Sequence, residues 1–255
     1  MSSTPISGTV KGCEIRALEG PSDFKKAEQV QLETWGYSER DVVPAAIFAV
    51  AHNFGGQALG AFEGARMIGF ALSFGTVGAG HLHFHSHMVA IVPEYQSRGL
   101  GRLIKLAQRE DALRRGVDQI MWTFDPLQVR NAYFNLAKLG GVGVRYLPDL
   151  YGKTSSPLHG GMPTDRLLIA WNLESERVLR ALDSKRETPN AEAVLVGIPP
   201  LGEDLPSAER LERQSGLRER LLSLMGEGYA ITGLERRGDI ASYILELSNS
   251  AMEKL

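Results

Sequence analysis

The sequence predicts an α/β fold: a mixed central sheet flanked by helices, followed by a small C-terminal β-α-β-β segment. Three observations predict it. Apolar residues change repeatedly between strand spacing and helix spacing along the chain. A glycine-rich turn near residue 99 joins a hydrophobic strand to an amphipathic helix. The composition, 43% hydrophobic and 23% charged in 255 residues, is that of a globular protein with a core of useful size.

The first half of the chain contains strand and helix patterns separated by glycine and proline. In order we expect a strand over 13–18, a helix from Pro21 to about Trp35, a helix over about 41–53, two strands within 57–74, a loop over 75–80, and a histidine-rich strand ending before Pro93.

The second half continues this alternation and then changes character. We expect a helix over 99–115, a strand over 118–124, a helix over 129–139, a strand over 166–173, a strand over 193–198, a helix within 206–226, and a hairpin over 228–247 that turns at Arg237-Gly238-Asp239. The polar stretch 175–192 is interpreted as a linker, so the predicted domains are 1–174 and 193–255.

Composition and charge exclude several classes of function. Lysine and arginine number 28 and aspartate and glutamate 30, a net charge of −2, so no general nucleic-acid or membrane attraction is expected. Cys13 is the only cysteine, which excludes an intrachain disulfide and makes a cysteine metal site untenable. The start lacks a signal-peptide pattern, and no apolar run approaches ~18 residues. We therefore expect a soluble, cytoplasmic protein.

The stretch VPEYQSRGLGRL (92–103) is the most informative motif. A strand ends at Val92, and Gly99 and Gly101 open an amphipathic helix whose first amide groups have no partner within the helix. Those amides and the helix dipole favour an anion such as a pyrophosphate. The spacing does not fit a Rossmann or a P-loop motif. A tight turn without a ligand is the alternative.

Gln96-Ser97-Arg98-Gly99-Leu100-Gly101, with its flanks, resembles the Q/R-x-x-G-x-G/A motif of the GNAT superfamily of acyl-CoA N-acyltransferases. The predicted element order is similar over about 13–173. HSHMVAIVPEYQSRGLG, TFDPLQVRNAYFNLAKLG and LYG…GMPTDRLLIAW resemble one branch of that superfamily, a likeness that names no substrate. The resemblance implies acetyl-CoA or another acyl-CoA as co-substrate, and no metal. It implies CoA contacts at Ile91, Val92, Gln96, Ser97, Arg98, Gly99, Leu100, Gly101 and Arg102.

NAYFNLAKLGG (131–141) resembles a second GNAT element, with two departures. The family's asparagine position falls on Val129, so Asn131 and Asn135 are expected to contact CoA instead. Its tyrosine position, the usual proton donor, falls on Leu136. Tyr133 is near in sequence but would point about 60° away on a helix, and packing is the favoured interpretation of it.

The stretch HLHFHSHM places His81, His83, His85 and His87 at alternate positions, so a regular strand would put them on one face, opposite Leu82, Phe84 and Met88. Two neighbouring imidazoles could share a zinc ion, but four in a row could not surround it. We therefore expect no metal site. For His81 and His83 we favour hydrogen-bonded strand histidines.

His85 lies fourteen residues before the first glycine of the motif, where GNAT enzymes often place a general base. His85-Ser86-His87 resembles the His-x-His of arylalkylamine N-acetyltransferases. Histidine suits the role because its ordinary pKa is ~6.5. We predict His85 as the base, directly or through water, and His87 as a relay or substrate contact. A strand bulge could change which histidine faces the thioester.

The predicted function is therefore transfer of an acyl group, most simply acetyl, from a CoA thioester to the amine of a small molecule or amino acid by direct attack. Arg130 could pair with a succinyl carboxylate, so the acyl chain stays open. The alternative is a degenerate domain that senses acyl-CoA without turnover. A homodimer could form through the C-terminal hairpin. Further candidates are Trp35, His52, Asp125 and Arg166, for which packing, capping or an ion pair with Asp165 or Asp149 competes with substrate binding.

Overall fold

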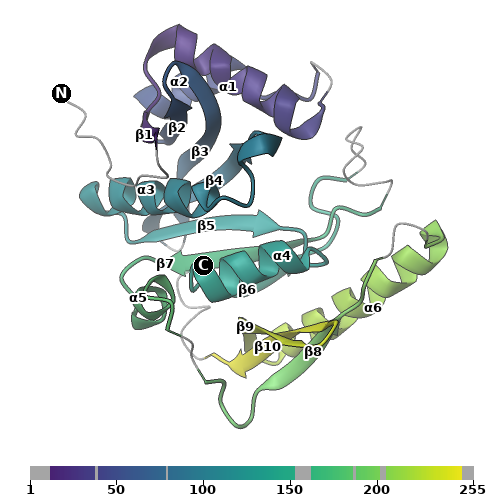
Figure 1. The fold of residues 1–255 in the computed structure, drawn as a ribbon. Coiled ribbons are helices and arrows are strands. Elements are labelled where there is room, and N and C mark those ends of the chain that lie inside the picture. Colours follow the sequence, from purple (N-terminus) through teal and green to yellow (C-terminus); the bar gives the residue numbers. More distant parts are fainter. Residues whose placement is uncertain are drawn as a thin grey trace. The chain divides into compact units, whose positions relative to one another are not determined.

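The structure is a computed structural model that describes residues 12–37, 40–78, 80–152, 162–185, 188–201 and 205–248 (Figure 1). The chain forms two compact units, unit 1 over Met1–Ile120 and unit 2 over Met121–Leu255. Residues 186–187 of the predicted linker and Gly161, the first residue of the GMPTDRL motif, lie outside the described residues.

Unit 1 is an antiparallel sheet in which each strand pairs with the next along the chain. Its elements are β1 (Cys13–Ala17), α1 (Gly20–Trp35), α2 (Ala45–Asn53), β2 (Gln57–Glu63), β3 (Arg66–Gly78), β4 (His81–Ile91), the 3₁₀ turn η1 (Pro93–Tyr95) and α3 (Leu100–Arg114).

Helices cover both faces of this sheet, as contacts along β3 show. Phe70 packs edge-to-face on Trp35 of α1 and Phe48 of α2, with ring centroids 6.4 and 5.1 Å apart. Ser73 lies three residues further, on the opposite face, and its Oγ accepts a 2.6 Å hydrogen bond from Gln108 of α3. The sheet therefore has an α1/α2 face and an α3 face.

Two predicted boundaries in unit 1 are wrong. The second helix begins at Ala45 rather than Asp41, because Pro44 has ψ 152°, an extended conformation from which a helix can only start. The predicted loop 75–80 is mostly strand, since β3 continues to Gly78 and pairs with β4 as far as His81. The glycines at 75 and 78 are thus tolerated within the hairpin.

Unit 2 contains a sheet with strand order β5-β7-β6-β9-β10-β8. Its elements are β5 (Gln119–Phe124), α4 (Val129–Ala132), the π-helix η2 (Tyr133–Lys138), β6 (Val142–Leu147), β7 (Arg166–Asn172), α5 (Glu176–Leu182), β8 (Val194–Ile198), α6 (Ser207–Gly226), β9 (Tyr229–Arg237) and β10 (Ile240–Leu247).

The sequence prediction missed two elements of unit 2. β6 pairs antiparallel with β7, although its residues were assigned to no element. Helix α5 lies within the predicted linker, where the Ser175 hydroxyl caps it by accepting from the Val178 N–H at 3.3 Å. The predicted helix 129–139 is a single α turn followed by a π-helix.

The C-terminal β-α-β-β segment continues the sheet of unit 2. Gly143 of β6 pairs with Ile231 of β9, and β10 lies between β9 and β8. On α6, Arg218 makes two hydrogen bonds to the fully buried carboxylate of Asp165, at 2.9 and 2.8 Å. The α/β fold class with this C-terminal segment is confirmed, whereas the predicted domain boundaries stay a prediction.

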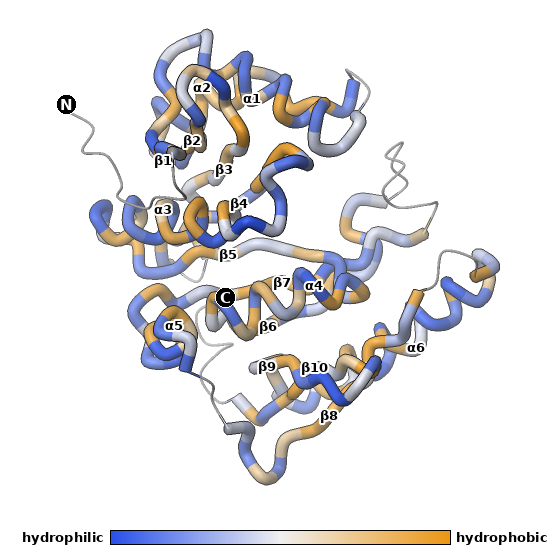
Figure 2. The backbone as a smooth tube through the Cα atoms, viewed as in Figure 1, coloured by the Kyte–Doolittle hydropathy of each residue, from blue (hydrophilic) through white to orange (hydrophobic). Residues whose placement is uncertain are grey.

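Burial follows the hydropathy pattern within each unit. Figure 2 shows hydrophobic and hydrophilic residues following one another along α3, whose inward side includes the buried Leu100, Ile104 and Ala107. A second core in unit 2 contains Met121 and Leu168. None of the helices within the described ranges is both long and apolar enough to cross a membrane.

Candidate functional site

The glycine motif forms a turn with two left-handed residues between β4 and α3. Ser97 has φ 62° and Gly99 has φ 85°. Only glycine adopts the second conformation without strain, and a non-glycine residue in the first is uncommon. α3 then begins at Leu100, so its first turn starts directly at the glycines.

The glycine turn is exposed to solvent at Gly99. Gly99 is exposed, and a Cβ at that position would meet no described atom within 4 Å. The Gly99 carbonyl accepts from the amides of Arg102 and Leu103, at 3.1 and 3.3 Å, which closes the first helical turn. The backbone amides that precede Arg102 in the chain have no acceptor within the helix and lie at its positive end. An anion could approach them there.

Side chains hold the turn in place and add positive charge. The Gln96 amide donates to the Ile91 carbonyl at 2.9 Å, which ties the loop to the end of β4. Arg98 is exposed and lies over the Tyr95 ring, 5.4 Å from its centroid. The Tyr95 hydroxyl donates to Glu63 at 2.5 Å. Gln96 therefore anchors the loop, and Arg98 adds an exposed positive charge beside it.

A bulge interrupts β4 at the histidines. Leu72 pairs with Met88 and Ser73 pairs with Ser86, so His87 is the extra residue. Beyond it the alternation is reversed: Met88 lies opposite Leu72 on the α1/α2 face, the face on which His85 lies opposite Phe74. The expectation that Met88 points away from the histidines is therefore wrong, because it assumed an uninterrupted strand.

His85 and His87 lie together on the α1/α2 face. Their ring centroids are 6.4 Å apart, and the His87 ring lies 5.7 Å from the Phe74 ring. Burial, then the neighbouring His87, His83 and Lys105, lower the pKa of His85 to about 4. Desolvation also lowers the pKa of His87, although part of that side chain is exposed. Both imidazoles are therefore neutral at pH 7 and able to accept a proton.

The other two histidines of the strand lie nearer the hairpin tip. His81 is exposed and pairs with Gly78. His83 is half-buried, and its Nδ1 is buried without a hydrogen-bond partner among the described atoms. The expectation that His83 is satisfied by hydrogen bonds is thus not met at this nitrogen. The described part of the chain holds no group of three or more metal-ligating side chains.

Ser86 carries a polar network on the α3 face, opposite the histidines. Lys105 is 4% exposed, and its Nζ donates to the Ser86 Oγ at 2.9 Å. Gln108 donates to the Ser86 and Ser73 hydroxyls at 3.1 and 2.6 Å. Sequence analysis missed this cluster, although a lysine on the apolar side of a helix, one turn before Gln108, is a signal that could have found it.

In unit 2 the helix after β5 places the remaining candidates in different surroundings. Asn131 is exposed, whereas Asn135 is 4% exposed and its Oδ1 accepts from the Trp122 indole at 3.2 Å. Leu136 is buried, and Tyr133 is 38% exposed beneath the Lys138 ammonium. Tyr133 is thus a surface residue rather than the packing residue we expected.

The other candidates have structural partners. Trp35 packs on Phe70, and Gly36 caps α1 with φ 60°. The Asp125 carboxylate accepts from the Leu127 N–H at 2.9 Å, a capping role. Arg166 lies over the Tyr151 ring and donates to the Asp165 carbonyl, whereas the Asp165 carboxylate binds Arg218.

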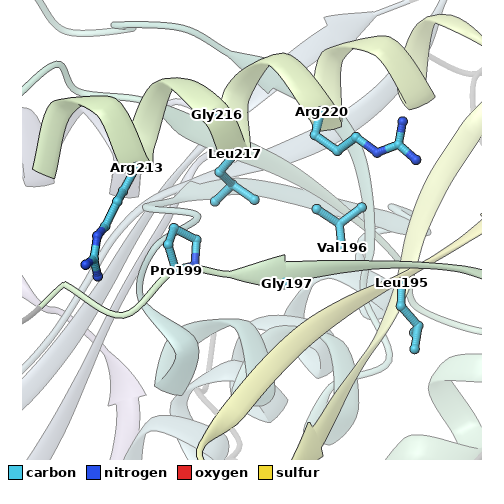
Figure 3. Close-up of a pocket in the computed structure, with 8 residues that line it drawn as sticks. All are labelled: Leu195, Val196, Gly197, Pro199, Arg213, Gly216, Leu217 and Arg220. Carbon is cyan, nitrogen blue, oxygen red and sulfur yellow. The ribbon is translucent and has the colours of Figure 1, made fainter. Parts of the chain in front are cut away.

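Unit 2 also contains two concave sites that the sequence did not indicate. A cavity of about 1380 Å³ lies between η2, α5 and strands β8 to β10, and six lysine or arginine side chains, including Arg130, line it beside two acidic ones. A smaller one of about 380 Å³ lies between β8 and α6. Figure 3 shows Val196 and Leu217 pointing toward one another there, with Arg213 and Arg220 at its two ends.

No protein-family model matches the sequence, and none of the curated proteins compared with it matches. Solved structures do match. The ribosomal-protein-S18-alanine N-acetyltransferase of Escherichia coli is 17% identical, with 64% of this chain and 95% of that chain covered and a TM-score of 0.51. A GNAT-family protein from Desulfovibrio desulfuricans is 16% identical, with 63% and 99% covered and a TM-score of 0.50.

This chain has the GNAT fold. The Salmonella typhimurium protein yncA, solved with its cofactor acetyl-CoA, is a third match at 16% identity, with 65% and 96% covered and a TM-score of 0.51. These GNAT structures are matched almost whole, whereas about a third of this chain lies outside each match. The predicted resemblance is confirmed at the level of the fold, and the activity depends on the residues of the site.

Proposed function

We propose that this chain is an acyl-CoA-dependent N-acyltransferase that moves an acyl group, most simply acetyl, from the CoA thioester to a primary amine. The observation that carries the proposal is the open left-handed turn at Ser97 and Gly99, which lies at the start of α3 and directly after the histidine-bearing strand β4.

The residues of the turn suit the pyrophosphate of an acyl-CoA. Amides around Gly99 and Gly101 would donate to its oxygens at the positive end of α3, and Arg98 and Arg102 would add positive charge. Ile91 would present backbone to the pantetheine arm, whereas the N–H of Val92 already donates to Ile68 and its carbonyl already accepts from Tyr95. The acyl-CoA supplies an activated thioester. Of the two asparagines that the sequence suggested for CoA, Asn131 is exposed, whereas Asn135 is buried against Trp122.

The two histidines suit the proton-transfer step. A neutral His85, with a pKa of about 4, is a weak base, but it need only accept the proton of an amine that becomes far more acidic as its C–N bond forms. His87 keeps an exposed surface and is suited to contact the amine or a bridging water. No covalent acyl-enzyme is invoked, since Cys13 is buried and burial raises the pKa of its thiol.

Backbone amides of β4 would stabilise the oxyanion of the tetrahedral intermediate. The Val92 N–H is unsuitable, because it donates to the Ile68 carbonyl at 3.1 Å. Leu136, at the family's tyrosine position, is buried and has no proton to give. The CoA thiolate would therefore leave with a proton from water.

The acceptor is proposed to be a small amine or an amino acid, with a protein N-terminus as the competing class. The fold alone does not separate them, because the matched Escherichia coli enzyme is named for an alanine of a ribosomal protein. Succinyl-CoA remains a candidate donor. A non-catalytic acyl-CoA sensor is the second candidate, favoured by Leu136.

The first test is thermal unfolding with and without acetyl-, succinyl- and longer acyl-CoAs. A ligand at 100 times its Kd adds about 2.7 kcal/mol to the free energy of unfolding. Absence of any midpoint shift in a folded sample would contradict the proposal. A screen for thiol release with amines and peptides follows: binding without release from any acceptor would favour the sensor.

Variants then test the base. His85→Ala and His87→Ala are each expected to lower kcat/KM about 100-fold or more with the true acceptor, while the acyl-CoA midpoint shift is kept. His81→Ala, at the exposed hairpin tip, is the matched control. If His85→Ala and His87→Ala both retain the wild-type kcat/KM, the assignment of the base is wrong.

A further inference from the structure

A buried lysine lies on the far side of the strand from the proposed catalytic histidines. Lys105 comes from the second turn of α3, and its Nζ donates to the Ser86 hydroxyl at 2.9 Å. Ser86 stands between His85 and His87 in the sequence and directly before the bulge. This hydrogen bond, together with the one that Gln108 donates to the same hydroxyl, links α3 to the segment of β4 that carries both histidines.

This placement is costly, so it requires a reason. A lysine ammonium is rarely buried, because removing it from water is unfavourable. Burial lowers the pKa of Lys105 to about 7. The buried carboxylate of Asp111 on the same helix is held by Arg114 and Arg115, at 3.2 and 2.9 Å. Methionine or leucine would fill the same apolar position without this penalty.

Each element around Lys105 contributes polar side chains to one hydrogen-bond network. Ser86 on β4, Ser73 on β3, Gln57 on β2 and Gln108 on α3 itself make up the network. Gln57 donates to the Asp111 carboxylate at 2.9 Å. On β4, His83, His85 and His87 are the titratable groups, and the charge of Lys105 acts on His85.

We propose that Lys105 is the positioning residue of the histidine pair. By holding Ser86 against α3, it fixes the bulged segment Ser86–Met88 and so the places of His85 and His87 on the opposite face. The purpose of this positioning rests on the proposed acyl transfer. The NMR test of the positioning itself needs no acyl transfer. Lys105 does not touch the reacting atoms, because it lies on the α3 face.

The structural arm of the test is an NMR titration of the histidine rings, which needs no substrate. Lys105→Met removes its hydrogen bond and the charge at similar volume, and Ser86→Ala removes the hydroxyl that Lys105 and Gln108 both bind. We expect Lys105→Met to shift the midpoint of His85 upward and to change the ring shifts of His85 and His87. Ser86→Ala should reproduce the ring-shift changes.

Ser73→Ala is the matched control, since it deletes another buried hydroxyl of the same network but leaves Lys105 bound to Ser86. It should leave the histidine titration unchanged. Histidine titrations identical to wild type in both test variants would overturn the proposal. So would equal changes in Ser73→Ala, which would show a general loosening of the core.

The kinetic arm uses an acceptor found in the amine screen. Lys105→Met and Ser86→Ala should lower kcat about 10- to 100-fold, with little change in the KM for acyl-CoA, and the double variant should lose no more than the larger single loss. Ser86→Thr keeps the hydroxyl and should restore most of the rate. A loss that appears only in the KM for acyl-CoA would overturn the proposal.

The two arms separate this inference from the proposed function. If the wild-type chain turns over no amine, the acyltransfer proposal fails, and the titration still decides whether Lys105 positions the histidines. If turnover is found but both variants keep the wild-type kcat and titrations, acyl transfer stands and the role of Lys105 is refuted.

Discussion

Arg218→Ala is expected to be one of the more destabilising single substitutions in the C-terminal segment. The guanidinium of Arg218 on α6 binds both oxygens of Asp165, at 2.8 and 2.9 Å, and the Asp165 carboxylate is fully buried. The Tyr146 hydroxyl at 2.6 Å and the Asp149 N–H at 3.0 Å would remain as its only described donors. Removing one partner of a buried ion pair costs about 3–5 kcal/mol. Because Arg218 is 25% exposed, we expect the lower end, about 3 kcal/mol.

The loss can be measured by urea unfolding and located by hydrogen exchange. A decrease of about 3 kcal/mol corresponds to a fall of roughly 6–12 °C in Tm for a chain of this size. Amides of β6 and α6 should exchange faster, since the ion pair joins α6 to the residue before β7. Arg220→Ala, in the same helix and exposed, is the matched control and should change stability by less than about 0.5 kcal/mol. If Arg218→Ala behaved like this control, the buried pair would not stabilise the segment as argued.

Three further predictions concern glycine geometry and a buried charge. Gly99→Ala should lower the free energy of unfolding by about 1 kcal/mol, because alanine is strained at φ 85°. The same variant should weaken acyl-CoA binding in a calorimetric titration. An unchanged free energy of unfolding would contradict the left-handed turn. Gly216→Ala should raise the free energy of unfolding by about 1 kcal/mol, since the site is helical and a Cβ there meets no described atom within 4 Å; a destabilised variant in urea unfolding would refute this. The folded-state pKa of Lys105, about 7, lies below its ordinary 10.5, so the unfolded chain binds more protons between these values and stability should rise with pH across that window. Unfolding measured from pH 7 to 10 should show the rise in wild type and a smaller one in Lys105→Met; equal slopes would refute it.

Elements bounded by local signals were predictable from the sequence. α3 begins after Gly99 and ends before Gly116, and the hairpin of β9 and β10 turns at Gly238, which has φ 60°. In each case the residues that end the element also determine its backbone conformation, so no distant contact is needed. The glycine turn of the site belongs to this class, which is why a tight turn between a strand and a helix could be expected from the twelve residues 92–103.

β6 was missed because its cause is not local. Glycine weakens a strand by itself, but a Cβ at Gly143 would lie 3.0 Å from the Ile231 Cβ and 3.1 Å from Leu167. A side chain at position 143 would therefore be crowded by β9 and β7, which pack against it from 88 and 24 residues further along the chain. A residue that weakens the strand locally thus suits the close packing of the sheet.

Strand β4 has one feature that its local sequence predicts and one that depends on a distant contact. Alternation alone predicted correctly that His85 and His87 lie near one another, but it placed Met88 on the wrong face, because one extra residue at position 87 reverses every later side chain. What holds that extra residue is a hydroxyl bound from another element, the contact of Lys105 with Ser86. A local pattern could therefore name the catalytic candidates, whereas their orientation depends on a buried amine nineteen residues away. For this site, the residue proposed to perform the chemistry and the residue proposed to position it are found by different arguments, the first from spacing and the second from burial.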